Sequence, residues 1–103
     1  MGKFCFFILS CSIEKYVSKR FKIWESTVQY LAQYADIYYI FGNSEKDISI
    51  PTHPNVFYLI MPCPDFYENI PLKVYYGMKC LSHLNYDFIV KIDGIEEPAV
   101  EIR

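Results

Sequence analysis

The fold is decided by residues 86–94, which read Tyr86-Asp87-Phe88-Ile89-Val90-Lys91-Ile92-Asp93-Gly94. The centre of this stretch is a short apolar run rich in β-branched residues, which is typical of a buried strand. It ends on the carboxylate of Asp93. Ligands of open α/β sheets bind outside the carboxyl ends of the strands, so Asp93 is a candidate ligand-binding residue. An Asp-Gly pair is also an ordinary turn signal, and this plainer interpretation stays open.

Three further apolar runs precede this strand in the sequence. They predict strands over residues 4–11, 36–41 and 56–61. Between the first two runs, from Val17 to Ala35, an apolar residue recurs every three or four positions. That spacing predicts one helix with a single apolar stripe.

A second helix is predicted from Leu72 to about Leu84. Asn69 is its expected N-cap, and Pro71 suits the first turn because a backbone N–H there has no partner within the helix. Gly77 is expected to let the helix approach the sheet closely. The apolar face of this helix is expected to contain Leu72, Tyr75, Tyr76, Cys80 and Leu84.

The alternation of strands and helices predicts an α/β fold with a mostly parallel sheet of about four strands and helices on both faces. A chain of 103 residues with 52% hydrophobic content has material for one core and too little for two. We therefore expect one domain over residues 1–94. Residues 95–103 are charged and contain Pro98, and we expect them to form an irregular C-terminal tail.

Charge and cysteine usage narrow the possible partners and compartment. The net charge is -2 and the basic residues are dispersed, which argues against nucleic acid as a partner. The four cysteines form no CxxC pair, so we expect free thiols in a reducing compartment, with a disulfide as the alternative. The apolar run near the N-terminus is short for an export signal, and no other run approaches the roughly 20 residues of a membrane span. The expected location is cytoplasmic.

Three segments together resemble one family, the beta-1,3-galactosyltransferase and fringe-like glycosyltransferases. Residues 8–10 and 19–26 are similar to the family's strand, its serine and the basic pair that opens a helix. Residues 65–73 are similar to its acidic-aromatic stretch ending in Asn-Leu-Thr-x-Lys, and residues 88–93 to the strand that ends in its Asp-x-Asp motif. The resemblance spans about residues 4–93. It implies the N-terminal, nucleotide-sugar half of a GT-A fold, which is Rossmann-like.

The resemblance also implies ligands and site residues. A UDP-sugar would be the donor, and a glycan or other hydroxyl compound the acceptor. Mn2+ or Mg2+ would be the cofactor, with Asp93 as a metal ligand, because a hard cation that bridges a diphosphate takes oxygen ligands. Gly94 and Ile95 stand where the family has further aspartates. The implied nucleotide-sugar-binding residues are Ser10, Cys11, Arg20, Lys73 and Asp93.

Plainer roles stay open for several of these residues. Arg20 can be a solvated residue on a helix face, Ser10 can simply end a strand, and Lys73 can pair with Asp65 or Glu68. The sequence identifies no catalytic residue.

The resemblance implies a glycosyltransferase-like protein, a hexosyltransferase by class. The Asp-x-Asp motif and the acceptor half are incomplete, so we expect a truncated protein that is weakly active or inactive alone. The alternative is a non-catalytic interaction module that self-associates, or pairs with a longer relative, through the exposed edge of its last strand. A third possibility is a frame change after codon 93.

Overall fold

The computed structural model describes residues 3–11, 17–43, 48–65 and 67–93. Four strands form one parallel sheet in the order β3-β2-β1-β4. They are β1 (Phe4–Leu9), β2 (Asp36–Phe41), β3 (Val56–Ile60) and β4 (Phe88–Asp93). The α/β architecture expected from the sequence is therefore confirmed, and the sheet is entirely parallel. The predicted tail over residues 95–103 lies outside the described residues.

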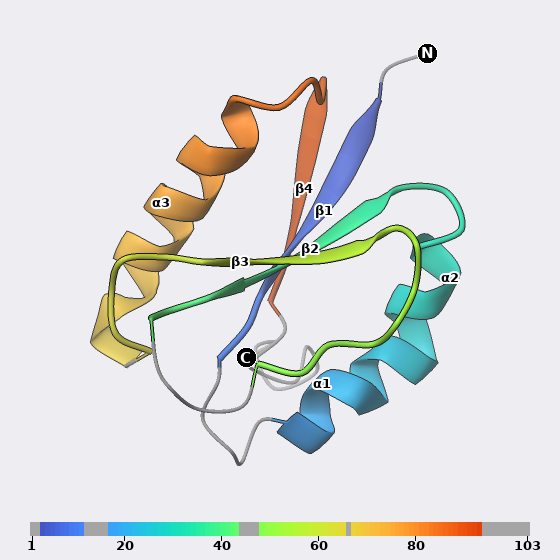
Figure 1. Ribbon diagram of the computed structural model, residues 1–103, viewed down its shortest axis with the longest axis horizontal. Coiled ribbons are helices and arrows are strands. Elements are labelled where there is room, and N and C mark those ends of the chain that lie inside the picture. Colours follow the sequence, from blue (N-terminus) through green and yellow to red (C-terminus); the bar gives the residue numbers. More distant parts are fainter. Residues whose placement is uncertain (1–2, 12–16, 44–47, 66, 94–103) are drawn as a thin grey trace, which may run out of the picture.

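Helices cover both faces of the sheet (Figure 1). On one face lie α1 (Val17–Ile23), the π-helical segment η2 (Trp24–Val28) and α2 (Gln29–Leu31). On the other face lies α3 (Ile70–Ser82), which follows the short 3-10 segment η3 (Tyr67–Asn69). In the described part of the chain, none of these helices combines the length and apolar character needed to cross a membrane.

The first helical region differs from the expectation of one regular helix that runs to Ala35. It contains the π-helical turn of η2, and the helix ends at Leu31. The Ser26 hydroxyl donates to the Ile23 carbonyl at 3.3 Å, an acceptor that a regular α-helix uses for its own backbone. Ala35 is nevertheless buried, because the turn after Leu31 still carries it onto the sheet.

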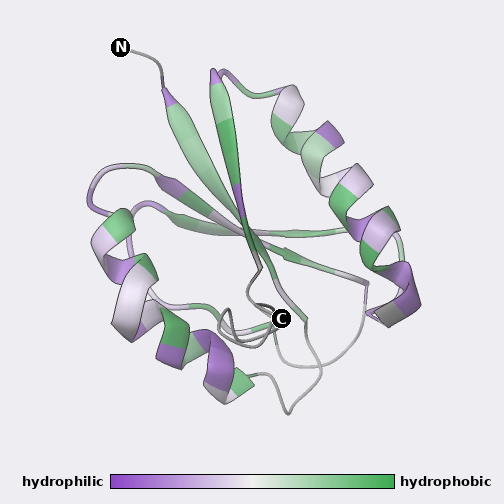
Figure 2. Ribbon diagram, turned by 180° about the vertical axis from the view of Figure 1, so that it is seen from behind, coloured by the Kyte–Doolittle hydropathy of each residue, from purple (hydrophilic) through white to green (hydrophobic). Residues whose placement is uncertain are grey.

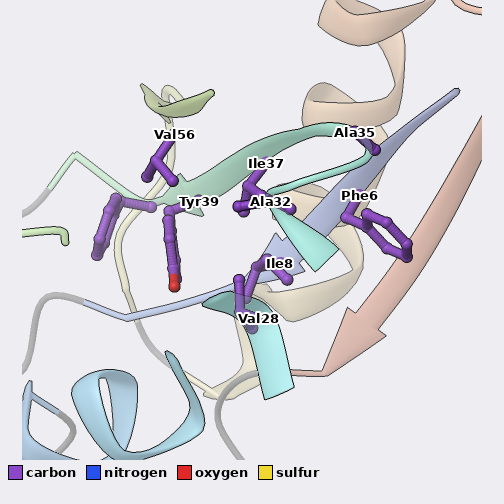
Figure 3. Close-up of a cluster of buried hydrophobic side chains, with 9 residues drawn as sticks. Phe6, Ile8, Val28, Ala32, Ala35, Ile37, Tyr39 and Val56 are labelled. Atoms are coloured by element: carbon purple, nitrogen blue, oxygen red, sulfur yellow. The ribbon is translucent and has the colours of Figure 1, made fainter. Parts of the chain in front are cut away.

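Alternate residues of each strand face opposite layers of the core. Phe6 and Ile8 of β1 pack with Val28 and Ala32 of the first helical layer, and Figure 3 shows this cluster. Phe7 and its odd-numbered neighbours on β1 pack on the α3 side. In Figure 2 hydrophobic residues run along most of the strands, whereas hydrophobic and hydrophilic residues alternate along the helices. Burial on both faces explains why β1 is a continuous apolar run rather than an alternating one.

The predicted apolar face of α3 is wrong in four of its five residues, whereas Tyr76 is partly buried and packs against the core as expected. Leu72, Tyr75, Cys80 and Leu84 are exposed, and the helix instead buries Lys73, Gly77 and Leu81. Sequence periodicity placed the charged Lys73 outward, whereas the fold turns it inward onto a buried partner. The buried stripe of α3 is therefore shifted by about one residue from the predicted one.

Three other expectations for α3 have separate outcomes. The close approach at Gly77 is confirmed: a Cβ there would lie 2.5 Å from the Phe7 ring. Pro71 sits in the first turn as expected. Asn69 occupies the N-cap position, but its side chain makes no capping hydrogen bond.

Candidate nucleotide site at the carboxyl ends of β1 and β4

The chain reverses its direction across the sheet between β1 and β4. From β1 it passes through α1 and α2 to β2 and then β3, and α3 carries it back on the other face to β4. Open α/β sheets bind their ligands at such a reversal, outside the carboxyl ends of the two strands. Ser10 and Cys11 follow β1, and Asp93 ends β4. Leu9 and Asp93 are partners in the register of β1 and β4, so these ends are adjacent.

Arg20 lies beneath the end of β1. It is 2% exposed, so the interpretation of a solvated charge on the helix face is wrong. Its Nε donates to Ser10 Oγ at 3.3 Å and its Nη2 to the Cys11 carbonyl at 2.8 Å, while Nη1 donates to the Ser49 carbonyl. The guanidinium also lies 4.8 Å from the centre of the Phe41 ring. Through these hydrogen bonds Arg20 links α1 to the end of β1 and to the segment before β3.

Lys73 reaches the same strand end from the opposite face. Its Nζ donates to the Ser10 carbonyl at 2.6 Å and to Asp65 Oδ1 at 2.7 Å. Of the two partners that the sequence offered for Lys73, the structure selects Asp65. Charge-assisted hydrogen bonds of this length are stronger than neutral ones. Two cationic side chains, one from the helical layer on each face of the sheet, therefore donate hydrogen bonds to the residues that follow β1.

Asp65 connects this cluster to the end of β2. The Gly42 N–H donates to Asp65 Oδ1 at 2.6 Å, and the Cys11 thiol contacts the Asp65 carbonyl at 3.6 Å. A Cβ at Gly42 would lie 2.5 Å from that Oδ1 and 2.6 Å from the Cys63 carbonyl, so only glycine fits here. Burial raises the pKa of the Cys63 thiol, and the Lys73 charge partly offsets this effect.

Four of the five predicted site residues meet in this cluster. Ser10, Cys11, Arg20 and Lys73 are joined by the contacts above. Asp93 is adjacent through its backbone register, while its side chain lies outside what the structure describes. Whether any of them contacts a nucleotide stays a prediction.

Sequence reasoning missed the roles of Gly42 and Ser49 and named Asp65 only as a possible partner of Lys73. The position of Gly42 directly after a strand was a signal for a close approach. Nothing in the sequence pointed to the Ser49 carbonyl, because a backbone acceptor carries no residue-type signal.

Tyr39 is a second residue that sequence reasoning missed. It is 1% exposed, and its hydroxyl has no hydrogen-bond partner from residues 3–11, 17–43, 48–65 or 67–93. Burial raises the pKa of this phenol to about 12, partly offset by the nearby charge of Arg20. In Figure 3 the Tyr39 side chain projects from β2 with its hydroxyl oxygen farthest from the strand. A buried hydroxyl without a partner costs stability.

The described residues do not by themselves fit a metal site. Among the side chains that the structure describes, no three His, Cys, Asp or Glu residues gather as metal ligands. Asp65, a described carboxylate in contact with this cluster, is engaged by Lys73 and Gly42. Cation binding at the carboxyl ends of β1 and β4 therefore stays a prediction, and it depends on Asp93.

A hollow of about 300 Å³ lies at the opposite, amino end of the sheet. Residues of β1 and β2 and of the loops beside them line it, among them Phe4 and Asp36. Nearby, the Tyr86 hydroxyl donates to Asp36 and lies 3.0 Å from the Tyr38 hydroxyl. Burial and these hydrogen bonds raise the pKa of Tyr86 well above its ordinary value. This hollow lies at the end of the sheet opposite the reversal point, and Asp36, Tyr38 and Tyr86 beside it are joined by hydrogen bonds.

Comparisons of the chain with protein-family models, with curated proteins and with solved structures found no match.

Proposed function

We propose that the chain binds a nucleotide sugar at the carboxyl ends of β1 and β4, as the nucleotide-sugar half of a GT-A type glycosyltransferase. One observation carries the proposal. The three segments that resemble the beta-1,3-galactosyltransferase and fringe-like family are far apart in the sequence, yet they converge on one point of the sheet. Ser10 and Arg20 come from the first segment, Lys73 from the second and Asp93 from the third, and that point is the reversal between β1 and β4.

The contacts suggest how the work is divided among these residues. Arg20 and Lys73 use their donors on protein acceptors, so in this proposal they are positioning residues that fix Ser10 and Cys11. Asp65 compensates the charge of Lys73. The Arg20 guanidinium would favour a diphosphate nearby, since a cation acts over several ångströms where water is partly excluded. Ser10 is 3% exposed and its hydroxyl accepts from Arg20, so it would help to shape the strand end. Asp93, at the end of β4, would be the residue in contact with the ligand.

Transfer of a sugar from UDP to a hydroxyl acceptor is the activity of the family that the chain resembles. Gly94 and Ile95 replace the further aspartates of its Asp-x-Asp motif. Loss of even an indirect partner of a metal ligand weakens metal binding by roughly 10 to 100-fold. We therefore propose weak or no transferase activity and a weak requirement for Mn2+ or Mg2+.

The cysteines favour a reducing compartment such as the cytoplasm for this function. All four are free thiols, and Cys5, Cys11 and Cys63 are buried among apolar neighbours or in the polar cluster. Disulfides are rare where glutathione keeps thiols reduced. We therefore propose a cytoplasmic location, where these thiols would stay reduced.

The direct test is the melting temperature of the chain, titrated with UDP in the presence of Mn2+ and again with EDTA. A ligand at about ten times its Kd stabilises the folded state by about 1.4 kcal/mol. For a domain of this size the melting temperature then rises by roughly 5–10 °C. If UDP at millimolar concentration leaves the melting temperature unchanged under both conditions, the proposal is wrong.

A pair of matched variants locates the site. Asp93→Asn removes the carboxylate at the carboxyl end of β4 and should abolish the part of the shift that depends on Mn2+. Asp87→Asn removes the carboxylate just before the other end of the same strand and should leave the shift intact. Equal effects of the two variants would place the ligand elsewhere.

A further inference from the structure

Strand β4 presents an apolar outer edge. It is an end strand of the sheet, and within the described part of the chain no strand pairs with its outer side. Phe88 and Val90 are 63% and 41% exposed. An open edge of this kind leaves a row of unpaired N–H and C=O groups that can template another strand.

The two faces of β4 differ in character. Phe88 and Val90 are in register with Phe4 and Phe6, so they lie on the face covered by α1 and α2. On the α3 face, Lys91 is in register with Phe7 and its side chain is exposed. Asp87, just before the strand, is also exposed and accepts the Lys3 N–H at 2.8 Å.

We propose that a second copy of this chain adds its own β4 antiparallel to this edge, with the twofold axis at Ile89. In this register Phe88 lies opposite Val90 of the second copy, so the exposed apolar side chains cover one another. Asp87 lies opposite Lys91 of the second copy, and the same pair recurs by symmetry. Ile89 lies opposite Ile89 of the second copy. The result is one continuous sheet of eight strands, four from each copy.

Charge complementarity selects this register over its neighbours. In the joined sheet, the α3 face of one copy should continue into the α3 face of the other. This requires even-numbered residues to lie opposite even-numbered ones, so the twofold axis must pass through a residue and not between two residues. An axis at Phe88 places Asp87 opposite Ile89 and forms no pair of opposite charges, and an axis at Val90 places Asp87 opposite Asp93 of the second copy. An axis at Lys91 places the two lysines opposite each other. Like charges directly opposite are unfavourable, whereas opposite charges stabilise the pair.

The other end strand fits a second copy less well. β3 carries no charged residue over Val56–Ile60, so nothing there specifies one register. Pro54 and Pro62 bracket it, and proline beside an edge strand discourages pairing. Lys91 has a competing interpretation as a charge that keeps β4 monomeric. The two interpretations of Lys91 predict opposite effects of reversing its charge.

Sedimentation equilibrium on charge-reversal variants tests the proposal. The unmodified chain should dimerise reversibly at roughly micromolar to hundred-micromolar concentration, as expected for a small interface. Lys91→Glu and Asp87→Lys each create two like-charge contacts and should weaken the dimer at least about tenfold. An equimolar mixture of these two variants should regain the dimer, because both of its contacts become attractive. The double variant should also regain it.

Two controls accompany the series. Lys22→Glu makes the same charge change at an exposed position of α1 and should leave the dimer unchanged. The melting temperature of each variant, measured at low concentration, shows that the fold is intact. A chain that stays monomeric at about 0.5 mM would overturn the proposal, as would tighter association of Lys91→Glu or a mixture that fails to dimerise. None of these outcomes depends on whether the strand ends bind a nucleotide.

Discussion

Lys73 Nζ lies 2.7 Å from Asp65 Oδ1, and the two side chains are 1% and 2% exposed. The pair joins α3 to the loop after β3, and through the Ser10 carbonyl it also joins α3 to β1. Removal of one partner from a buried pair leaves the other charge without compensation. Such a loss is much more costly than the net contribution of the intact pair.

We therefore expect Asp65→Asn to lower the free energy of unfolding by about 3–5 kcal/mol. Lys73→Met should cost a similar amount, while the double variant should cost clearly less than the sum. Urea denaturation followed by circular dichroism measures all three. Additive losses in the double variant would show that the two side chains act independently.

Tyr39→Phe should stabilise the protein. The substitution removes a buried hydroxyl that lacks a partner among the described residues, and such a group costs about 1–3 kcal/mol. Tyr38→Phe is the matched control, because the Tyr38 hydroxyl lies 3.0 Å from that of Tyr86 and its loss should be neutral or destabilising. The urea midpoint should therefore rise for Tyr39→Phe and stay the same or fall for Tyr38→Phe. A lower midpoint for Tyr39→Phe would mean that its hydroxyl is satisfied in solution.

Gly77→Ala should destabilise the protein although alanine favours helices. The new Cβ would lie 2.5 Å from the Phe7 ring and 3.1 Å from Ile40, in a tightly packed core. Overpacking of this kind costs about 1–3 kcal/mol, more than the roughly 1 kcal/mol gained in helix propensity. Lys79→Ala, at an exposed position of the same helix, should change stability by less than about 0.5 kcal/mol. Thermal denaturation of both variants makes the comparison.

The four cysteines should differ sharply in reactivity. Cys80 is exposed, whereas Cys5, Cys11 and Cys63 are buried, and burial raises the pKa of the Cys5 thiol to about 11. Because the thiolate is the reactive form, we expect one thiol to react quickly with a chromogenic disulfide at pH 8. The other three should react only as the protein unfolds. Cys80→Ser should remove the fast phase, and a fast phase that survives would show that a buried thiol is accessible.

Stability should fall at alkaline pH. Burial raises the pKa of Cys5 from 9.0 to about 11 and that of Tyr39 from 10.0 to about 12. Both groups are neutral when protonated, so the unfolded chain releases these protons at lower pH than the folded chain does. Their contribution is complete below about pH 9 and is lost as the pH rises through 11 and 12. Each shift corresponds to at most about 3 kcal/mol.

Urea midpoints from pH 7 to pH 11 measure this loss. Tyr39→Phe should flatten the upper part of the curve, since it removes one of the two groups. A stability that stays constant to pH 11 would contradict the burial of both.

The strands were predictable because their signal is local. Runs such as residues 36–41 are apolar, bounded by turn residues and too short for helices, and the structure keeps them within two residues of their expected ends. The exposed face of α3 was not predictable in this way. Periodicity counts lysine as a surface residue, and Lys73 becomes a core residue only because Asp65, eight positions earlier, is buried beside it.

The candidate site likewise has a part that the sequence predicts and a part that it does not. Ser10 and Asp93 could be placed from the sequence, because strand ends can be located from apolar runs. The partners of Arg20 could not, since two of them are backbone carbonyls brought together only by the folded chain. The lack of a hydrogen-bond partner for the Tyr39 hydroxyl among the described residues is likewise a property of its surroundings rather than of its residue type.

The contacts at the end of β1 also bear on the order of folding. Lys73 meets the Ser10 carbonyl across 63 positions of the chain, and Arg20 meets Ser49 across 29. Contacts that close such long loops form late, because the entropy of closure is lost before the contact is gained. The strand end is therefore organised only when β1, β2 and α3 are already assembled. A nascent chain that ends before α3 would contain Ser10, Cys11 and Arg20 but neither Lys73 nor Asp93, so it could not form this cluster.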